Sequence, residues 1–289
     1  MIDDLALPFV QRGLLEVGVL AIGAGLIGTW IVLRGLSFFA HAVGTAAFPG
    51  LVLADGLGFA AALGAFGTAL LVAGIVAWLA RRERDREDAL TALVLVAALA
   101  VGIVLASDVF RSGANVDQLL FGSLLTIDTG DVVLAAVASA IVLVASFVLG
   151  PRWLATGFER DLSEADGRST ARTDAALLVL VALVAVASLA AVGALLATAI
   201  LIVPAATTRL VVSRMRTWQL ATVGLVLVEG MAGMLLAVET NAPPGATIAV
   251  LSGGVFMVVA VWNAAARGLA VHWKKLALGA RSSGAGELR

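Results

Sequence analysis

The stretch RGLSFFAHAVGTAAFPGLVLA, Arg34–Ala54, places polar side chains inside a segment that is otherwise apolar. At 1.5 Å per residue, a helix over residues 35–54 is long enough to cross a hydrocarbon core of about 30 Å. Ser37, His41 and Thr45 follow one another at intervals of four residues, so a helix carries them on one face as a polar stripe. This stretch therefore predicts a membrane-spanning helix with a polar face.

Pro49 lies four residues after Thr45 and has no backbone N–H, which leaves the carbonyl of Thr45 without its helical partner. Lipid cannot satisfy that carbonyl, so we expect a helix kink at Pro49 and a neighbourhood of protein, water or an ion. Two interpretations of the stripe stay open. His41 and Thr45 hydrogen-bond to a neighbouring helix, or Ser37, His41 and Thr45 line a translocation path.

The composition places the whole chain in a membrane. Of 289 residues, 61% are hydrophobic and 13% are charged, against about 25% charged in soluble domains. The absence of cysteine excludes disulfides, thiolate metal sites and cysteine nucleophiles. The acidic N-terminus leads into a full-length apolar run without an A-x-A cleavage site, so we expect no removed signal peptide. These features predict a multi-pass protein of the plasma membrane.

Apolar runs between charged or turn-forming residues give the candidate spans. They cover residues 14–33, 36–54, 60–80, 89–106, 131–149, 175–191, 193–208, 218–238 and 246–266. The run from 175 to 208 is long for one helix and short for two crossings, so we expect eight or nine segments. The prediction is an all-α helix bundle formed by a transmembrane domain, residues 1–276, with a disordered cytoplasmic tail, residues 277–289.

The positions of the basic residues predict the orientation. With the N-terminus outside and the C-terminus cytoplasmic, 17 of the 19 Lys and Arg residues fall on the inner side, and only Arg12 and Arg111 fall outside. The six tryptophans lie close to the inner basic clusters, as an interfacial aromatic belt would. The outer side is acidic, with Asp3, Asp4, Asp55, Asp108, Asp117, Asp128, Asp131 and Glu239. Such a face suits a cationic substrate or a basic partner, or simply marks loop ends that stay hydrated.

Several catalytic signatures are absent from the sequence. It contains no G-x-x-x-x-G-K-S/T, and its only lysines are Lys274 and Lys275, so it has no P-loop for ATP. His41 and His272 are its only histidines, which excludes H-E-x-x-H, and G-x-S-x-G is missing. An intramembrane enzyme is therefore disfavoured.

Two other regions carry polar chemistry. Glu229 lies in the middle of an apolar segment, where a carboxylate is either bonded to a neighbouring helix or faces an interior cavity. With His41 it could form the ion or proton relay of a stand-alone secondary transporter or channel, although no convincing inverted repeat supports that hypothesis. The loop RLVVSRMRTW, Arg209–Trp218, is short and basic, as expected of a segment that docks a soluble partner or anionic lipid.

Four stretches together resemble one family. GALLATAILIVPAATTRLVVSRM, Gly193–Met215, resembles the signature of the permease subunits of ABC importers for manganese, zinc and iron. LLFGSLLTI at 119–127, PPGATIAVLSG at 243–253 and the Arg34–Ala54 stretch are similar to further segments of that family, in the same order. The resemblance spans nearly all of residues 14–266.

The resemblance implies a transport subunit and not an enzyme. It implies a homodimer in the lipid membrane, a cytoplasmic ABC ATPase docked at Arg209, Arg214, Met215 and Arg216, and an extracytoplasmic metal-binding protein. It implies a transported metal cation and no permanently bound cofactor, and nothing in it points to nucleic acid.

One departure from the family pattern concerns the metal. Family members usually carry Asp and His, four residues apart, as candidate metal-contacting groups where this chain has His41 and Thr45. His41 is therefore the candidate metal ligand here. Imidazole suits zinc, copper, iron or nickel better than an oxygen-preferring ion, so the cargo stays open among manganese, zinc and iron.

Overall fold

The structure is a computed structural model that describes residues 7–82, 87–110, 116–158 and 170–284. Within these ranges the chain is helical, with no β-strand. The α-helices are α2 (Pro8–Arg34), α3 (Ser37–Leu57), α4 (Ala61–Arg82), α5 (Glu87–Val104), α6 (Val116–Phe121), α7 (Thr129–Phe158), α9 (Thr170–Ala187), α10 (Leu189–Val192), α11 (Ala197–Arg209), α12 (Met215–Thr240) and α13 (Pro244–Gly284). A π-helical turn, η2 (Leu105–Val109), extends α5, and a 3₁₀ turn, η3 (Leu124–Thr126), precedes α7.

Seven of the described helices are long and apolar enough to cross a membrane: α2, α3, α4, α5 with η2, α7, α12 and α13. The expected all-helical membrane bundle is therefore confirmed. The region 175–208, which we expected to supply one or two further segments, forms the shorter apolar helices Thr173–Ala187 and Ala197–Arg209. These two helices account for the difference between the seven long helices and the expected eight or nine segments.

The break between the two short helices lies at Gly193. Its φ of 82° is in the left-handed region, and a Cβ there would collide with the backbone of Leu120 and Gly122. The N–H groups of Ala194 and Leu195 donate to the carbonyls of Leu119 and Leu120 at 3.0 and 3.1 Å. These bonds satisfy backbone groups that the interrupted helix leaves free, so the break is a built feature of the fold.

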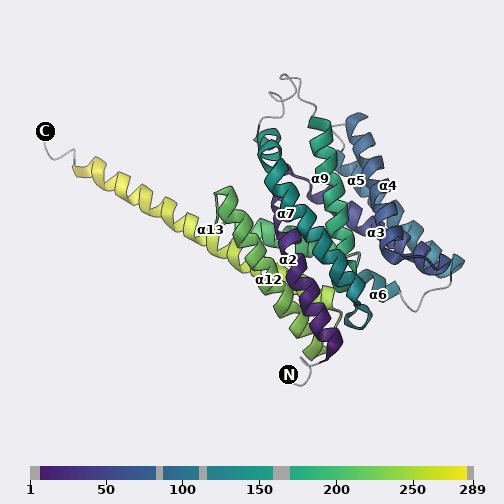
Figure 1. Ribbon diagram of the computed structural model, residues 1–289. Coiled ribbons are helices and arrows are strands. Elements are labelled where there is room, and N and C mark those ends of the chain that lie inside the picture. The colour runs from purple at the N-terminus through teal and green to yellow at the C-terminus, as the bar shows by residue number, and fades with distance from the viewer. Residues whose placement is uncertain (1–6, 83–86, 111–115, 159–169, 285–289) are drawn as a thin grey trace.

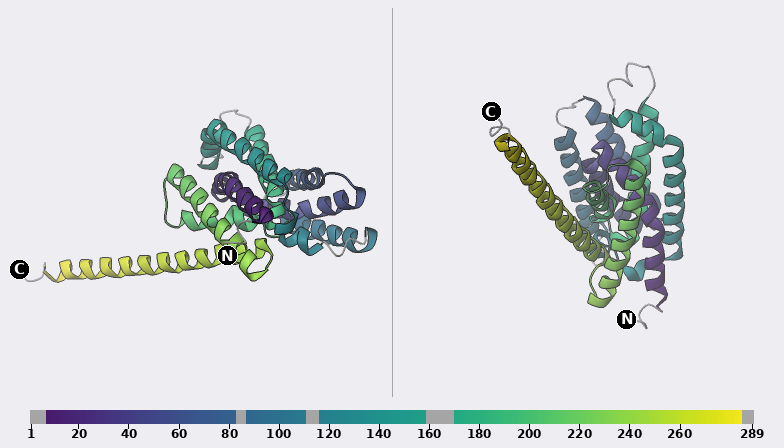
Figure 2. Two further views of the ribbon diagram at one scale, coloured as in Figure 1. Left: turned by 60° about the horizontal axis from the view of Figure 1, so that its bottom comes forward. Right: turned by 90° about the vertical axis from the view of Figure 1, so that its left-hand side faces the viewer.

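The last helix, α13, leaves the bundle (Figures 1 and 2). Its backbone is helical as far as Gly284, beyond residue 276, while residues 285–289 lie outside the described ranges. The division into a domain of residues 1–276 and a tail of residues 277–289 stays a prediction.

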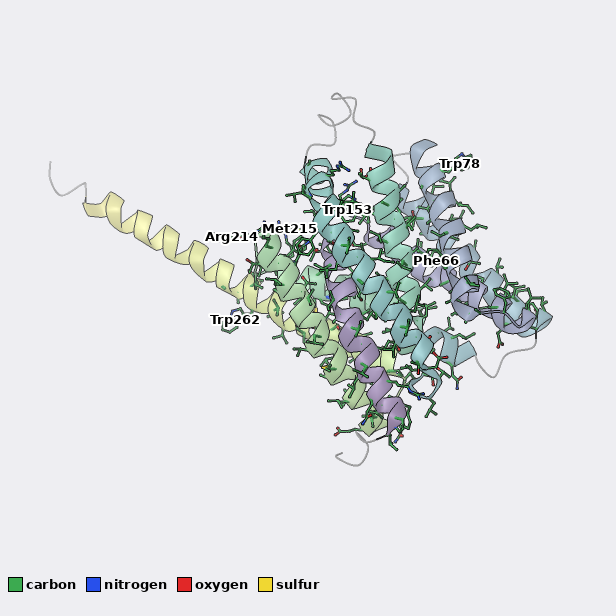
Figure 3. The ribbon with its side chains drawn as sticks, viewed as in Figure 1. Phe66, Trp78, Trp153, Arg214, Met215 and Trp262 are labelled. Carbon is green, nitrogen blue, oxygen red and sulfur yellow. The ribbon has the colours of Figure 1, made fainter. Side chains whose placement is uncertain are left out.

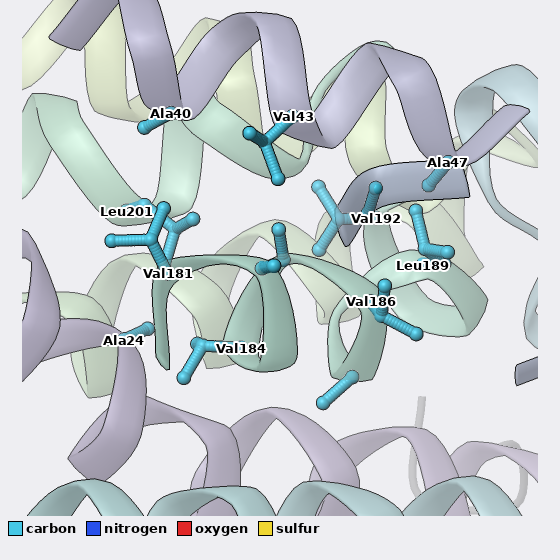
Figure 4. Close-up of a cluster of buried hydrophobic side chains, with 14 of the residues drawn as sticks. Ala24, Ala40, Val43, Ala47, Val181, Val184, Val186, Leu189, Val192 and Leu201 are labelled. Carbon is cyan, nitrogen blue, oxygen red and sulfur yellow. The ribbon is translucent and has the colours of Figure 1, made fainter. Parts of the chain in front are cut away.

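The centre of the bundle is formed by α2, α3, α9 and α11. In the membrane-crossing stretches of α2 and α3, 72% and 78% of the residues are buried, against 28% in α4 and 17% in α5 and α13. Figure 4 shows Val43 of α3 pointing toward α9, where Val181 lies beside Leu201 of α11. The helix that carries the polar stripe is therefore a core element, and α4, α5, α7 and α13 lie on the periphery.

A close helix crossing joins α3 to α4 at Gly50 and Gly64. A Cβ added at Gly50 would collide with the carbonyl of Gly64, and one added at Gly64 would collide with the carbonyl of Gly50. Small residues allow this kind of backbone approach between membrane helices. Pro49 lies beside this crossing inside α3, which continues from Ser37 to Leu57.

A polar network joins α2, α7 and α9 at the end of the bundle that we expect to face the cytoplasm. Arg34 Nη2 lies 2.6 Å from Asp174 Oδ1, and Arg34 Nη1 donates to the carbonyl of Trp153 at 3.4 Å. Trp153 Nε1 donates to the carbonyl of Thr173 at 2.9 Å, and its ring meets that of Trp30 edge-on, with 5.3 Å between centroids. We call these five residues the Arg34 network.

Candidate functional site

The polar stripe lies on α3 as its spacing predicted. Ser37 and His41 are half-buried, and Thr45 is completely buried. The hydroxyl of Thr45 has no hydrogen-bond partner among the described residues. A buried hydroxyl without a partner costs free energy, so Thr45 is not explained by stability alone.

His41 is held by a residue that the sequence reasoning missed. Its Nδ1 lies 2.9 Å from Oγ1 of Thr198, in the first turn of α11. Gly44 of α3 faces the same threonine, since a Cβ on Gly44 would lie 3.4 Å from Cγ2 of Thr198, in van der Waals contact. His41 therefore bonds to a neighbouring helix, as one of the two interpretations expected. Thr45, for which that interpretation expected the same, has no such bond among the described residues. Thr198 lies within the motif of Gly193–Met215, but nothing local in that motif points to a contact 157 residues away.

Glu229 lies apart from the stripe. It is 2% exposed, and Ser252 of α13 donates to its Oε2 at 2.6 Å, while Oε1 has no partner within the described ranges. Its helix α12 packs against α2, α11 and α13, whereas the main neighbours of α3 are α4, α5, α9 and α11. The structure thus places α11 between the two groups that the relay hypothesis needed to bring together.

A second buried carboxylate, Glu16 on α2, was also missed. Its side chain has no exposed surface, and neither carboxylate oxygen makes a well-formed hydrogen bond within the described residues, although the backbone N–H of Ala191 interacts with the carboxylate more weakly. Asp131 and Asp128 are the acidic groups that act on it electrostatically. The signal was available in the sequence, because Glu16 falls inside the predicted span 14–33, but a charge so near the end of a span looks interfacial.

Three of the acidic residues predicted for the outer side line one pocket. Asp55 at the end of α3 and Asp128 and Asp131 at the start of α7 border a pocket of about 360 Å³, together with Gln118 of α6. The N–H of Asp131 donates to Asp128 Oδ1 at 2.9 Å, and that of Asp128 donates to Asp131 Oδ2 at 3.0 Å. These two residues therefore cap α7. Among the described residues, no three His, Cys, Asp or Glu side chains are grouped closely enough to hold a metal ion.

The basic loop joins α11 to α12 in a compact turn. Arg209 Nη1 donates to the carbonyls of Val212 and Ser213 at 3.3 and 3.1 Å, and its guanidinium lies 4.9 Å from the ring centroid of Trp218. The indole of Trp218 donates to the carbonyl of Ala205 at 2.9 Å, which clamps the start of α12 onto α11.

The same loop presents an exposed basic surface. Arg209, Arg214 and Arg216 are exposed and Met215 is half-buried. Figure 3 shows Arg214 and Met215 at the start of α12. Asn263 of α13 donates to the carbonyl of Leu210, so three helices fix the loop. This geometry suits a rigid docking surface.

Comparison with known proteins gives a consistent result over nearly the whole chain. The sequence model of the ABC 3 transport family matches residues 6–263. The manganese transport system membrane protein MntC of Halalkalibacterium halodurans is 27% identical over 271 residues, covering 93% of this chain and 92% of that protein. A probable iron transport system membrane protein of Haemophilus influenzae is 26% identical over 263 residues, covering 91% and 97%.

A solved structure shows the same fold. PsaBC from Streptococcus pneumoniae, determined in complex with a Fab, includes a chain that superposes with a TM-score of 0.80. That chain is 28% identical in sequence, and the match covers 89% of this chain and 93% of the solved one.

Proposed function

Because the chain belongs to the ABC 3 transport family, as its four sequence motifs indicated, we propose that it is the membrane permease subunit of a metal importer. The cargo is a divalent manganese, zinc or iron ion. The observation that carries this proposal is the full-length likeness to relatives named for manganese and iron transport, joined to the shared fold. The imidazole of His41 keeps zinc among the candidates.

A partner chain supplies the energy. The sequence has no P-loop, and the exposed basic loop with Arg209, Arg214, Met215 and Arg216 is where a cytoplasmic ATPase docks. The clamps from Trp218 and Asn263 would transmit a displacement of that loop to α11, α12 and α13. The N-terminus then lies outside and the C-terminus inside, an extracytoplasmic metal-binding protein docks on the acidic outer face, and two copies of the chain form the complex.

The stripe of Ser37, His41 and Thr45 lines the path of the ion. Two features of α3 support this assignment: a half-buried imidazole with one occupied nitrogen, and a buried hydroxyl without a partner among the described residues. His41 acts as a transient ligand. Glu229 is a weaker candidate because α12 does not pack against α3 and the carboxylate bonds to Ser252. The same separation disfavours the relay of a stand-alone transporter.

The test is ATP-driven uptake into proteoliposomes that hold this chain, its ATPase and its binding protein, with manganese, zinc and iron offered separately. Native protein should accumulate one of the metals only with ATP, and His41→Ala should abolish uptake while the ATPase still binds. His272→Ala, which removes the only other histidine, is the matched control and should transport normally. Normal uptake by His41→Ala would place the path elsewhere, and an assembled, ATP-hydrolysing complex that moves none of the metals would refute the metal assignment.

A further inference from the structure

We infer that Thr198 is a positioning residue for His41, whose hydroxyl holds Nδ1 and leaves Nε2 as the nitrogen that meets the passing cation. This inference rests on the proposed function, because it assigns the way in which the stripe presents its ligand. Nothing in the family resemblance pointed to Thr198, and the contact comes from the packing of α11 against α3.

The geometry is specific to one ring nitrogen. Nδ1 of His41 lies 2.9 Å from Oγ1 of Thr198, within the range of a good hydrogen bond. Thr198 is 8% exposed, so water does not readily compete for its hydroxyl. Among the described residues, no hydrogen bond to Nε2 of His41 is found. One nitrogen is thus engaged by the protein, and the other is left for a ligand.

The chemistry of imidazole gives this arrangement a purpose. A neutral imidazole carries one N–H and one lone pair, and only the nitrogen with the lone pair can bind a metal ion. The 2.9 Å contact fits either direction of the hydrogen bond. The inference assigns the proton to Nδ1 and the acceptor role to the Thr198 hydroxyl, which fixes the lone pair at Nε2 and restricts rotation of the ring. Partners of this kind orient metal-ligating histidines, and their loss costs about 10- to 100-fold in metal affinity or activity.

The position of Thr198 also explains why a threonine serves here. It lies in the first turn of α11, opposite Gly44, and its methyl group Cγ2 faces that glycine. The methyl group therefore packs between the helices while the hydroxyl reaches His41. A valine would keep the packing and lose the hydrogen bond, and a serine would keep the hydrogen bond and lose the methyl group.

These substitutions make the test. Thr198→Val should raise the metal concentration for half-maximal ATP-driven uptake by about 10-fold or more, and Thr198→Ser should restore it to near the native value. The matched control is Thr207→Val on the same helix, because the Thr207 hydroxyl bonds at 2.8 Å only to the carbonyl of Val203 in its own helix. That control should leave uptake unchanged.

A second readout follows His41 directly. With His272 replaced by alanine, ¹⁵N-labelled histidine reports on His41 alone. The native spectrum in lipid nanodiscs should show one tautomer, with the proton on Nδ1, and Thr198→Val should give a mixture of tautomers. A native spectrum with the proton on Nε2 would mean that Thr198 donates to Nδ1, and it would overturn the inference. A merely structural role for Thr198 would not change this pattern.

The outcomes separate the inference from the proposed function. If Thr198→Val keeps both the native metal concentration for half-maximal uptake and the native ¹⁵N spectrum, the inference is overturned while the importer assignment stands. The same follows if Thr198→Ser restores neither or only one of these two readouts. Absence of uptake of any metal by the native complex would instead refute the proposed function. In that case the ¹⁵N spectra of the native and Thr198→Val proteins would still decide whether Thr198 positions His41.

Discussion

The polar groups of the Arg34 network are hydrogen-bonded to one another, whereas several other buried polar groups of the bundle have no such partner in the part of the chain that the structure describes. In the Arg34 network, a guanidinium, a carboxylate and an indole N–H all have partners within the protein. By contrast, both oxygens of Glu16, the hydroxyl of Thr45 and one oxygen of Glu229 are buried without a well-formed hydrogen bond among the described residues. Paired groups tie helices together, whereas unpaired groups cost stability. The difference teaches which polar residues maintain the fold and which need a functional explanation.

The largest change in unfolding free energy should come from removing the Trp153 ring at the centre of the Arg34 network. Trp153→Ala deletes a completely buried indole and its bond to Thr173, so we expect a loss of about 4 kcal/mol of unfolding free energy. Trp262, which is 76% exposed, is the matched control, and Trp262→Ala should cost less than about 1 kcal/mol. Unfolding in mixed detergent micelles measures both. Equal losses would mean that the network does not hold the bundle together.

Replacing either of two buried threonines should change the unfolding free energy by an intermediate amount, and the two changes should have opposite signs. Thr208 shares its hydroxyl with Thr222 at 2.7 Å and with the carbonyl of Pro204 at 2.9 Å, so Thr208→Val should cost about 1–2 kcal/mol. Thr45→Val removes a hydroxyl that has no partner and should stabilise the protein by about 1 kcal/mol.

The same Thr45 variant separates stability from function. If Thr45 lines the path, Thr45→Val should slow metal uptake in proteoliposomes even though thermal unfolding occurs at a higher temperature. A destabilised Thr45→Val protein would show that the hydroxyl does have a partner in the folded state.

The smallest effect should come from Glu16. Glu16→Gln replaces an unpaired carboxyl by a nearly isosteric amide, so the unfolding free energy should change by less than about 1 kcal/mol. Asp174→Asn, which removes the charge that faces Arg34, is the comparison and should cost more in the same unfolding experiment. A loss for Glu16→Gln as large as that for Asp174→Asn would show that the Glu16 carboxylate has a strong partner in the folded protein.

Much of the fold follows from the sequence because apolar length alone places membrane helices. The predicted spans 14–33 and 218–238 lie inside α2 and α12, and the predicted span 36–54 begins one residue before α3 and ends inside it. The region 175–208 was harder, since its break depends on Gly193 and on hydrogen bonds to a segment far away in the chain. The length of an apolar helix depends on the local sequence. The hydrogen bonds that pair the backbone groups freed at a helix break come from residues far away in the chain.

The candidate site was predictable only in part for the same reason. The stripe follows from four-residue spacing within α3, and the compact basic loop follows from its own composition. Thr198 could not be found, because its contact with His41 depends on how α11 packs against α3. The same packing separates Glu229 from His41, and no periodicity in the sequence reports which helices are neighbours.

The crossing of α3 and α4 restricts how this protein can evolve. At Gly50 and Gly64 each missing Cβ would meet a backbone carbonyl, so no second-site change of side chain can make room for a larger residue at either position. Only displacement of α3 or α4 could do so. Displacing α3 would carry His41 away from Thr198, and displacing α4 would open its packing against α3. Descendants of this chain can therefore vary the residues that face lipid freely, but they inherit the two glycines and the ligand geometry together.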